Sequence, residues 1–285
     1  MRGHQARTGL LFVLPCVVLF AAFRFGPAIA GAALSFTDFT IGGETSWTGL
    51  ANFRRLVDDP TFWSAVRVTI VYTVLAVPLS VLASLAMALL TRRTSLGTRF
   101  FRSVFFLPVV TSLVLAGVVF TWVFSEGGPW SSILGAVGLP RQSWLADSVL
   151  VIPALVLVSV WSRFGYGMLI ILARLQDLPA ELEEAAMTDG ANAWQRFRFV
   201  VLPQLRPALF FLVVIETTVS FQVFDTVYVM TGGGPVRASY TLVYALFDQG
   251  FRYFDLGYAS AIGVALFIMT LVVAVIQRVT LGRES

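Results

Sequence analysis

The sequence contains no lysine, one histidine and one cysteine. Without lysine the chain cannot form the GxxxxGK[ST] phosphate-binding loop, in which the lysine contacts the phosphates, or a lysine Schiff base. The single histidine, His4, lies in the N-terminal tail, which excludes a histidine-based triad or zinc site. Cys16 cannot form an internal disulfide, and we interpret it as a buried thiol within an apolar run. Catalysis by this chain alone is therefore not expected, and ATP-driven work would need a second polypeptide.

Charged residues are also scarce. They make up 13% of the chain, whereas 57% of the residues are hydrophobic and the mean hydropathy is +0.82; a typical soluble protein has about 25% charged residues. The apolar runs reach the ~20 residues that a helix needs to cross a bilayer, without the alternating polarity of barrel strands. We predict an all-α integral membrane protein with one domain over residues 1–285. The six expected transmembrane helices are 10–36, 68–90, 103–125, 149–173, 207–230 and 256–277.

All 20 basic residues are arginines, and their positions predict the orientation of the chain. Cytoplasmic links of membrane proteins carry an excess of basic residues, which explains the pI near 9.6 better than nucleic acid binding does. The arginines assigned to the cytoplasmic side are Arg2, Arg7, Arg92, Arg93, Arg99, Arg102, Arg174, Arg196, Arg198, Arg206, Arg278 and Arg283. Both termini are therefore expected in the cytoplasm. The N-terminus imitates a signal peptide, but the arginine count favours retention of the first span.

The polar link between the fourth and fifth spans, residues 177–203, has a distinct pattern. Pro179 suits the first turn of a helix, and the acidic residues that follow lie near the positive end of the helix dipole. Leu182, Ala185 and Ala186 share one face, which the two alanines keep shallow. Asp189-Gly190 indicates a turn, after which Trp194, Phe197 and Val201 form a second amphipathic piece. We predict a helix–turn–helix across the cytoplasmic face.

This link resembles the coupling motif of ABC importer permeases. The matching pattern is Glu184-Ala185-Ala186, three residues, Gly190, nine residues, Val200, one residue and Leu202-Pro203. Val200 replaces the isoleucine that is common in the family, a conservative change. The resemblance implies that the first helix docks into a cleft on an ATPase subunit and transmits its closure to the spans. The ATPase-coupling residues carried over by position are Glu184, Ala185, Ala186, Gly190, Leu202 and Pro203.

The resemblance extends over nearly the whole chain. Phe105-Phe-Leu-Pro108, Trp161 and Phe224-Asp-Thr-Val-Tyr-Val-Met-Thr-Gly-Gly-Gly-Pro235 are similar to the carbohydrate-uptake branch of these permeases, including the maltose and glycerol-3-phosphate permeases. This implies a permease subunit of the bacterial inner membrane that imports a sugar or sugar-like solute by alternating access. The implied partners are a second, homologous permease in a heterodimer, two ATP-binding subunits, an extracytoplasmic solute-binding protein and membrane lipid. No cofactor is expected in this chain, because ATP would bind the partner subunits.

Four ionisable residues fall inside the expected spans: Arg24, Arg163, Glu216 and Asp225. A charge at mid-bilayer costs ~2.5–3.5 kcal/mol on insertion scales, so these residues should face protein or water. One interpretation is a polar translocation path, and the other is a buried ion pair, such as Arg163 with Glu216, that fixes helix packing. Gln222 and Asp225, three residues apart, would share a face of the fifth span.

Phe221 would stack on a sugar ring beside the face that carries Gln222 and Asp225. The predicted solute path therefore comprises Arg163, Glu216, Phe221, Gln222 and Asp225.

Two other classes of protein remain as alternatives. An ion-coupled secondary transporter would use Glu216 and Asp225 as coupling carboxylates. It predicts inverted repeats, broken spans and activity without partners, but no repeat is apparent and the coupling motif would have no role. An integral-membrane enzyme ranks last, because the sequence has no convergent nucleophile, base or metal set.

Overall fold

The computed structural model describes residues 2–40, 43, 45–92 and 96–280 of the chain. These residues form helices joined by short links, and the only β-pairings among them are two isolated bridges. Five helical segments are long and apolar enough to cross a membrane: Leu11–Leu34, Pro60–Leu90, Val151–Gln176, Ala193–Phe221 and Leu256–Thr280. A sixth span is possible if the bent pair Gly97–Val110 and Leu113–Val123 counts as one. The predicted all-α membrane fold is confirmed.

The chain divides into two compact units, Met1–Trp63 with Ala245–Ile268, and Ser64–Tyr244 with Met269–Ser285. The first unit includes the helices α1 (Arg2–Phe20), η1 (Ala21–Phe25), α2 (Gly26–Leu34), α3 (Ala51–Asp58) and η3 (Asp248–Arg252). The second includes α5 (Leu96–Val110), α6 (Leu113–Val123), α7 (Pro129–Ala136), α8 (Val151–Gln176), α9 (Ala180–Thr188), α10 (Ala193–Arg196), η2 (Phe197–Val201), α11 (Leu202–Phe221) and α12 (Asp225–Met230). The helices that pass from one unit to the other are α4 (Pro60–Leu90), α13 (Leu242–Phe247) and α14 (Leu256–Thr280).

Within the first unit, a polar cluster connects α3 and Asp59 to the start of α14. Arg55 of α3 forms an ion pair of 2.6 Å with Asp255, and its guanidinium lies 3.9 Å from the ring centroid of Tyr258. The Tyr258 hydroxyl donates a hydrogen bond of 2.7 Å to Asp59. Burial raises the pKa of the Asp59 carboxyl, but the hydrogen bonds from Tyr258 and Thr61 outweigh this effect and hold the pKa below its ordinary value.

The first expected span is formed by α1, η1 and α2. No residue in the most apolar 18-residue stretch of this span is buried by the rest of the chain. Cys16 lies on α1 and is exposed, so the expectation of a buried thiol is wrong. The apolar run predicted burial, but in a membrane helix such a run needs only an apolar medium around it. Arg24 lies in η1, a π-helical turn within this span.

The core of the second unit is built around α8. Its buried side chains pack with α4, α11 and η2 in a cluster that comprises Ala88, Met168, Ile171, Leu172, Leu175, Val201, Leu205 and Leu212. Two glycines of α8 permit the close approach of this helix to α5 and α4. A Cβ at Gly165 would lie 2.3 Å from the Phe105 carbonyl oxygen of α5, and one at Gly167 would lie 2.3 Å from the Ser84 hydroxyl of α4. Small residues at such contacts are typical of packed membrane helices.

Two expected spans are broken rather than continuous. The span predicted over 103–125 consists of α5 and α6, which meet at an angle of 96°. The span predicted over 207–230 ends with α11 at Phe221, and α12 begins only at Asp225. Non-helical backbone is tolerated at membrane depth where it is buried in protein or lines a cavity, and hydropathy alone carries no signal for such a break. Of the arginines that predicted the orientation, Arg93 and Arg283 lie outside the described residues.

Candidate translocation cavity and coupling segment

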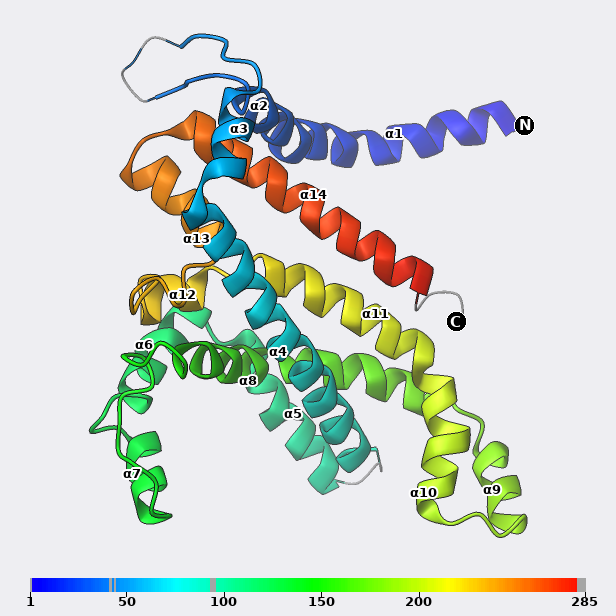
Figure 1. The fold of residues 1–285 in the computed structure, drawn as a ribbon. Helices are drawn as coiled ribbons and strands as arrows, with labels where there is room; N and C mark the ends of the chain where they lie inside the picture. The colour runs from blue at the N-terminus through cyan, green and yellow to red at the C-terminus, as the bar shows by residue number, and fades with distance from the viewer. Residues whose placement is uncertain (1, 41–42, 44, 93–95, 281–285) are drawn as a thin grey trace. The chain divides into compact units, whose positions relative to one another are not determined.

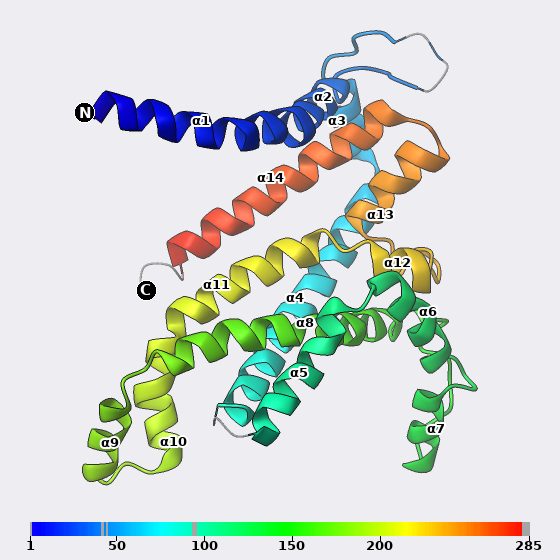
Figure 2. The same cartoon turned by 180° about the vertical axis from the view of Figure 1, so that it is seen from behind.

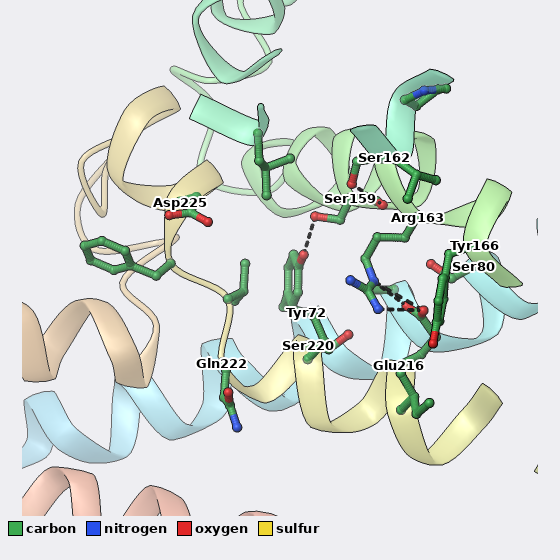
Figure 3. A pocket seen from close by; sticks show the side chains of 18 of the residues that line it. Tyr72, Ser80, Ser159, Ser162, Arg163, Tyr166, Glu216, Ser220, Gln222 and Asp225 are labelled. Atoms are coloured by element: carbon green, nitrogen blue, oxygen red, sulfur yellow. Dashed lines mark hydrogen bonds and ion pairs between the residues drawn. The ribbon is translucent and has the colours of Figure 1, made fainter. Parts of the chain in front are cut away.

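The two helix breaks of the second unit line the same polar cavity. The cavity has a volume of about 400 Å³, within the ordinary range for small-molecule sites. Its walls come from α4, α8 and α11, together with the α5–α6 and α11–α12 junctions (Figure 3). The polar or charged residues that line it are Tyr72, Ser80, Thr111, Ser159, Ser162, Arg163, Tyr166, Glu216, Ser220, Gln222 and Asp225.

Arg163 of α8 and Glu216 of α11 form an ion pair at the edge of this cavity. The Arg163 Nε lies 2.9 Å from Oε2 and 3.2 Å from Oε1 of Glu216, and Nη2 lies 3.0 Å from Oε1. The Glu216 side chain is only 3% exposed, whereas that of Arg163 is 28% exposed. Arg163 and Glu216 therefore fit both interpretations, because the ion pair joins two helices and also faces the cavity (Figure 3).

Hydroxyl groups form a second part of the cavity wall. The hydroxyls of Tyr72 and Ser159 lie 2.5 Å apart, and Ser162 donates a hydrogen bond of 2.9 Å to the Ser159 carbonyl. Tyr166 is exposed and lines the same space. These residues could not be assigned to a site from the sequence, because single hydroxyls within apolar runs are equally typical of ordinary helix packing.

The remaining predicted solute-path residues are arranged differently from the expectation. Gln222 and Asp225 both line the cavity, but they lie on either side of the break after α11 and do not share a helical face. Figure 3 shows their side chains pointing in different directions. Phe221 is 6% exposed and is not part of the cavity wall, whereas Phe224 is. A face at three-residue spacing needs a continuous helix, and this helix is interrupted.

The link predicted to be a coupling segment forms α9 and the start of a longer helix. Helix α9 begins after Pro179, with Glu181 and Glu183 in its first turn. Figures 1 and 2 show α9 and α10 projecting beyond the neighbouring ends of α8 and α11. Leu182 and Met187 are 43% and 52% exposed, and Glu184 and Ala185 are also exposed. This helix therefore presents an apolar and acidic surface that the second unit does not cover.

Gly190 ends α9 in the left-handed conformation, with φ +80°. Its amide donates to the Met187 carbonyl over 3.0 Å, and the Ala191 amide donates to the Ala186 carbonyl over 2.9 Å. These two bonds define a Schellman motif, in which glycine is preferred because a Cβ is strained at positive φ. The predicted turn at this position is confirmed.

The helix after the turn begins with a capping box. The Gln195 amide donates to the Asn192 side chain over 2.9 Å, and the Asn192 amide donates to the Gln195 side chain over 2.8 Å. The Asn-x-x-Gln spacing could have predicted this start. From α10 the helix continues through η2 into α11, passing Leu202 and Pro203. The second amphipathic piece is thus the beginning of a span rather than a separate helix.

An ion pair joins α9 to the end of α4. Arg92, two residues after α4, contacts the carboxylate of Glu183, and the two side chains are 34% and 27% exposed. Arg102 of α5 donates two hydrogen bonds to the Thr91 carbonyl, of 3.1 and 2.6 Å. Sequence spacing could not indicate a pairing across 91 positions.

In the part of the chain that the structure describes, no group of three or more histidine, cysteine, aspartate or glutamate side chains is placed to hold a metal ion. An ion pair, hydroxyl groups and two helix breaks around the cavity define the site.

Comparison with known proteins extends this description. The family model described as "Binding-protein-dependent transport system inner membrane component" matches residues 95–283. The lactose transport system permease protein LacF of Rhizobium radiobacter is 31% identical over 283 residues, which cover 97% of this chain and 95% of LacF. The arabinooligosaccharides transport system permease protein AraP of Bacillus subtilis (strain 168) is 34% identical over 271 residues, covering 94% and 86% of the two chains.

The fold is also that of a solved transporter. A crystal structure of a bacterial ABC transporter involved in the import of the acidic polysaccharide alginate contains a chain with a TM-score of 0.84 and 22% identity, with 99% of each chain covered. The long apolar helices and the family match together define a multi-pass membrane transport protein. The chain belongs to the family of binding-protein-dependent transport system inner membrane components, the permease subunits of ABC transporters.

Proposed function

We propose that this chain is the transmembrane permease subunit of an ATP-driven importer for a sugar or sugar-like solute. Family membership and relatives named for lactose and arabinooligosaccharide transport support the class of solute. The cavity between α4, α8 and α11 would form part of the translocation path, which opens alternately to the two sides of the membrane. ATP would be bound and hydrolysed by separate subunits, and this chain would hold no cofactor.

The observation that carries the proposal is the uncovered surface of α9. It presents Leu182 and Ala185 on one face and Glu184 and Met187 on the opposite face, on a helix held between a Schellman turn and an ion pair to Arg92. A shallow apolar surface with an acidic rim suits a groove lined by apolar and basic side chains. We infer that this groove belongs to an ATPase subunit, that α9 lies on the cytoplasmic side, and that both termini lie there too.

The complete importer would contain four further polypeptides. They are a second, homologous permease that completes the translocation path, two ATPase subunits, and a solute-binding protein on the extracytoplasmic side. The description of the matching family names dependence on a binding protein and an inner-membrane location.

Purification of the tagged chain from its native membranes, followed by reconstitution into vesicles, tests the proposal. Mass spectrometry should identify an ATPase and a second permease, and uptake should require ATP and the binding protein. A chain that purifies alone and moves solute with an ion gradient would instead support a secondary transporter, with Glu216 and Asp225 as its coupling carboxylates.

A further inference from the structure

The charges around the cavity of the second unit do not favour an anion. Among the described residues that line it, the acidic and basic side chains are one arginine, Arg163, and two carboxylates, Glu216 and Asp225. We propose that the cavity selects uncharged, polyhydroxylated solutes over anionic ones, and that Glu216 determines this specificity by cancelling the charge of Arg163. The inference rests on the proposed function and specifies the class of its solute.

The geometry of the ion pair explains why Arg163 is not a free anion site. Both Glu216 oxygens accept hydrogen bonds from the guanidinium, at 2.9–3.2 Å, so the side of the guanidinium that carries Nε and Nη2 is already occupied. An anion at the end of the guanidinium that carries Nη1 would lie beside a group whose charge the Glu216 carboxylate cancels, so it would gain little net attraction. To take the bidentate position at Nε and Nη2 instead, it would have to displace a carboxylate that is only 3% exposed and leave that carboxylate buried without its partner.

Asp225 adds a second negative charge. It is exposed at the start of α12 and lines the cavity across from the ion pair (Figure 3). An incoming anion thus meets a neutral pair on one side and a carboxylate on the other. Repulsion between like charges is substantial at short range in a site of reduced dielectric constant.

An uncharged polyol finds better partners in the same space. Thr111 and Tyr166 are exposed in the cavity, and their hydroxyl oxygens can accept hydrogen bonds from sugar hydroxyls. The exposed carboxylate of Asp225 accepts hydrogen bonds from sugar hydroxyls without any change in charge. The rings of Tyr166 and Phe224 provide apolar surface for the C–H face of a sugar.

The test uses the whole transporter in vesicles, with its binding protein, and matched solutes that differ in charge. The pairs are galactose and galacturonate, cellobiose and cellobiouronate, and glycerol and glycerol 3-phosphate. ATP-driven uptake by the wild-type transporter should favour the neutral member of a transported pair by at least about tenfold. Uptake of an anionic member at a rate equal to that of its neutral partner would overturn the proposal.

Variants of the cavity then identify the residue responsible. Glu216→Gln should leave Arg163 uncompensated and reduce the preference for the neutral solute by about tenfold, whereas Glu216→Asp should retain the preference. The double change Arg163→Gln with Glu216→Gln removes both charges and should also retain it. If Glu216→Gln leaves the preference unchanged, Glu216 does not determine specificity.

A second variant avoids the buried pair. Asp225→Asn changes only an exposed side chain, so it should assemble even if Glu216→Gln does not, and it should also weaken discrimination against the anion. ATP-driven uptake that prefers anions would overturn this inference while leaving the proposed function intact. Absence of an ATPase from the purified complex would overturn both.

Discussion

Arg92 and Glu183 form an ion pair that ties α9 to the end of α4. Both side chains are about one-third exposed or less, and such pairs contribute only ~0–1 kcal/mol to stability. The pair therefore matters more for the position of α9 than for the stability of the fold. Helix α4 also supplies Tyr72 and Ser80 to the cavity, so the ion pair links the proposed docking helix to a helix of the proposed translocation path.

Loss of this ion pair should uncouple ATP hydrolysis from transport. In Arg92→Ala or Glu183→Ala, α9 would still dock on the ATPase but would pass less of its movement to α4. We expect uptake per ATP hydrolysed to fall roughly fivefold, the factor that corresponds to about 1 kcal/mol. Parallel assays of ATP hydrolysis and solute uptake in vesicles measure this ratio.

The control for this variant is Glu181→Ala. Glu181 is an exposed acid in the first turn of the same helix, so its removal changes the charge of α9 equally. The exchange Arg92→Glu with Glu183→Arg should restore much of the coupling. If both single variants transport as efficiently as Glu181→Ala, the ion pair has no role in coupling.

A side chain at Gly190 should weaken assembly with the ATPase. Alanine in the left-handed conformation costs ~1–2 kcal/mol. Because a Cβ at Gly190 would meet no neighbouring atom, this cost comes from backbone strain alone. Gly190→Ala should therefore reduce co-purification of the ATPase, and Gly190→Asn should reduce it less. Gly127→Ala is the matched control, because Gly127 has equal space and no positive φ.

A larger side chain at Ala185 should block docking without unfolding α9. Ala185 is exposed, so Ala185→Leu adds no clash within the chain. It would fill the shallow part of the proposed contact surface, and overpacked contacts typically cost 1–3 kcal/mol. We expect the ATPase to be lost from the purified complex. Ala180→Leu places the same side chain on a different face of α9, and this variant should retain the ATPase. Equal retention of the ATPase by both variants would argue against docking through Ala185.

A methyl group at Gly167 should destabilise the second unit. Its Cβ would lie 2.3 Å from the Ser84 hydroxyl and 2.9 Å from a Leu212 methyl, at the centre of the α4–α8–α11 contact. We expect a loss of about 1–3 kcal/mol, visible as a lower melting temperature in detergent. Gly31→Ala, where a Cβ meets no atom within 4 Å, should melt like the wild type.

The sequence was sufficient to predict the helical membrane fold and the turn at Gly190, because both depend on local properties. Long apolar runs require helices in a bilayer, and Asp-Gly after an amphipathic segment favours a left-handed helix end. The breaks after α5 and α11 were not predicted, since hydropathy does not distinguish a continuous apolar helix from an interrupted one.

The cavity was predictable only in part. Arg163 and Glu216 were identified because charge in a membrane span requires a partner. Phe221 was assigned to the solute path because a continuous helix was assumed, but the break after α11 places Phe224 in the cavity wall instead. Tyr72 and Ser159 come from helices far apart in sequence, and only the tertiary structure shows that their hydroxyls meet.

Site-specific cross-linking from α9 would examine its proposed contact with the ATPase. The exposed Cys16 is first replaced by serine, and a photoreactive benzophenone is attached to the single cysteine of Met187→Cys or, as a control on α7, Ile133→Cys. In the intact complex, the probe on α9 should cross-link to the ATPase subunit, and the probe on α7 should not. A complex that transports solute but gives no ATPase adduct from α9 would contradict the proposed coupling mechanism.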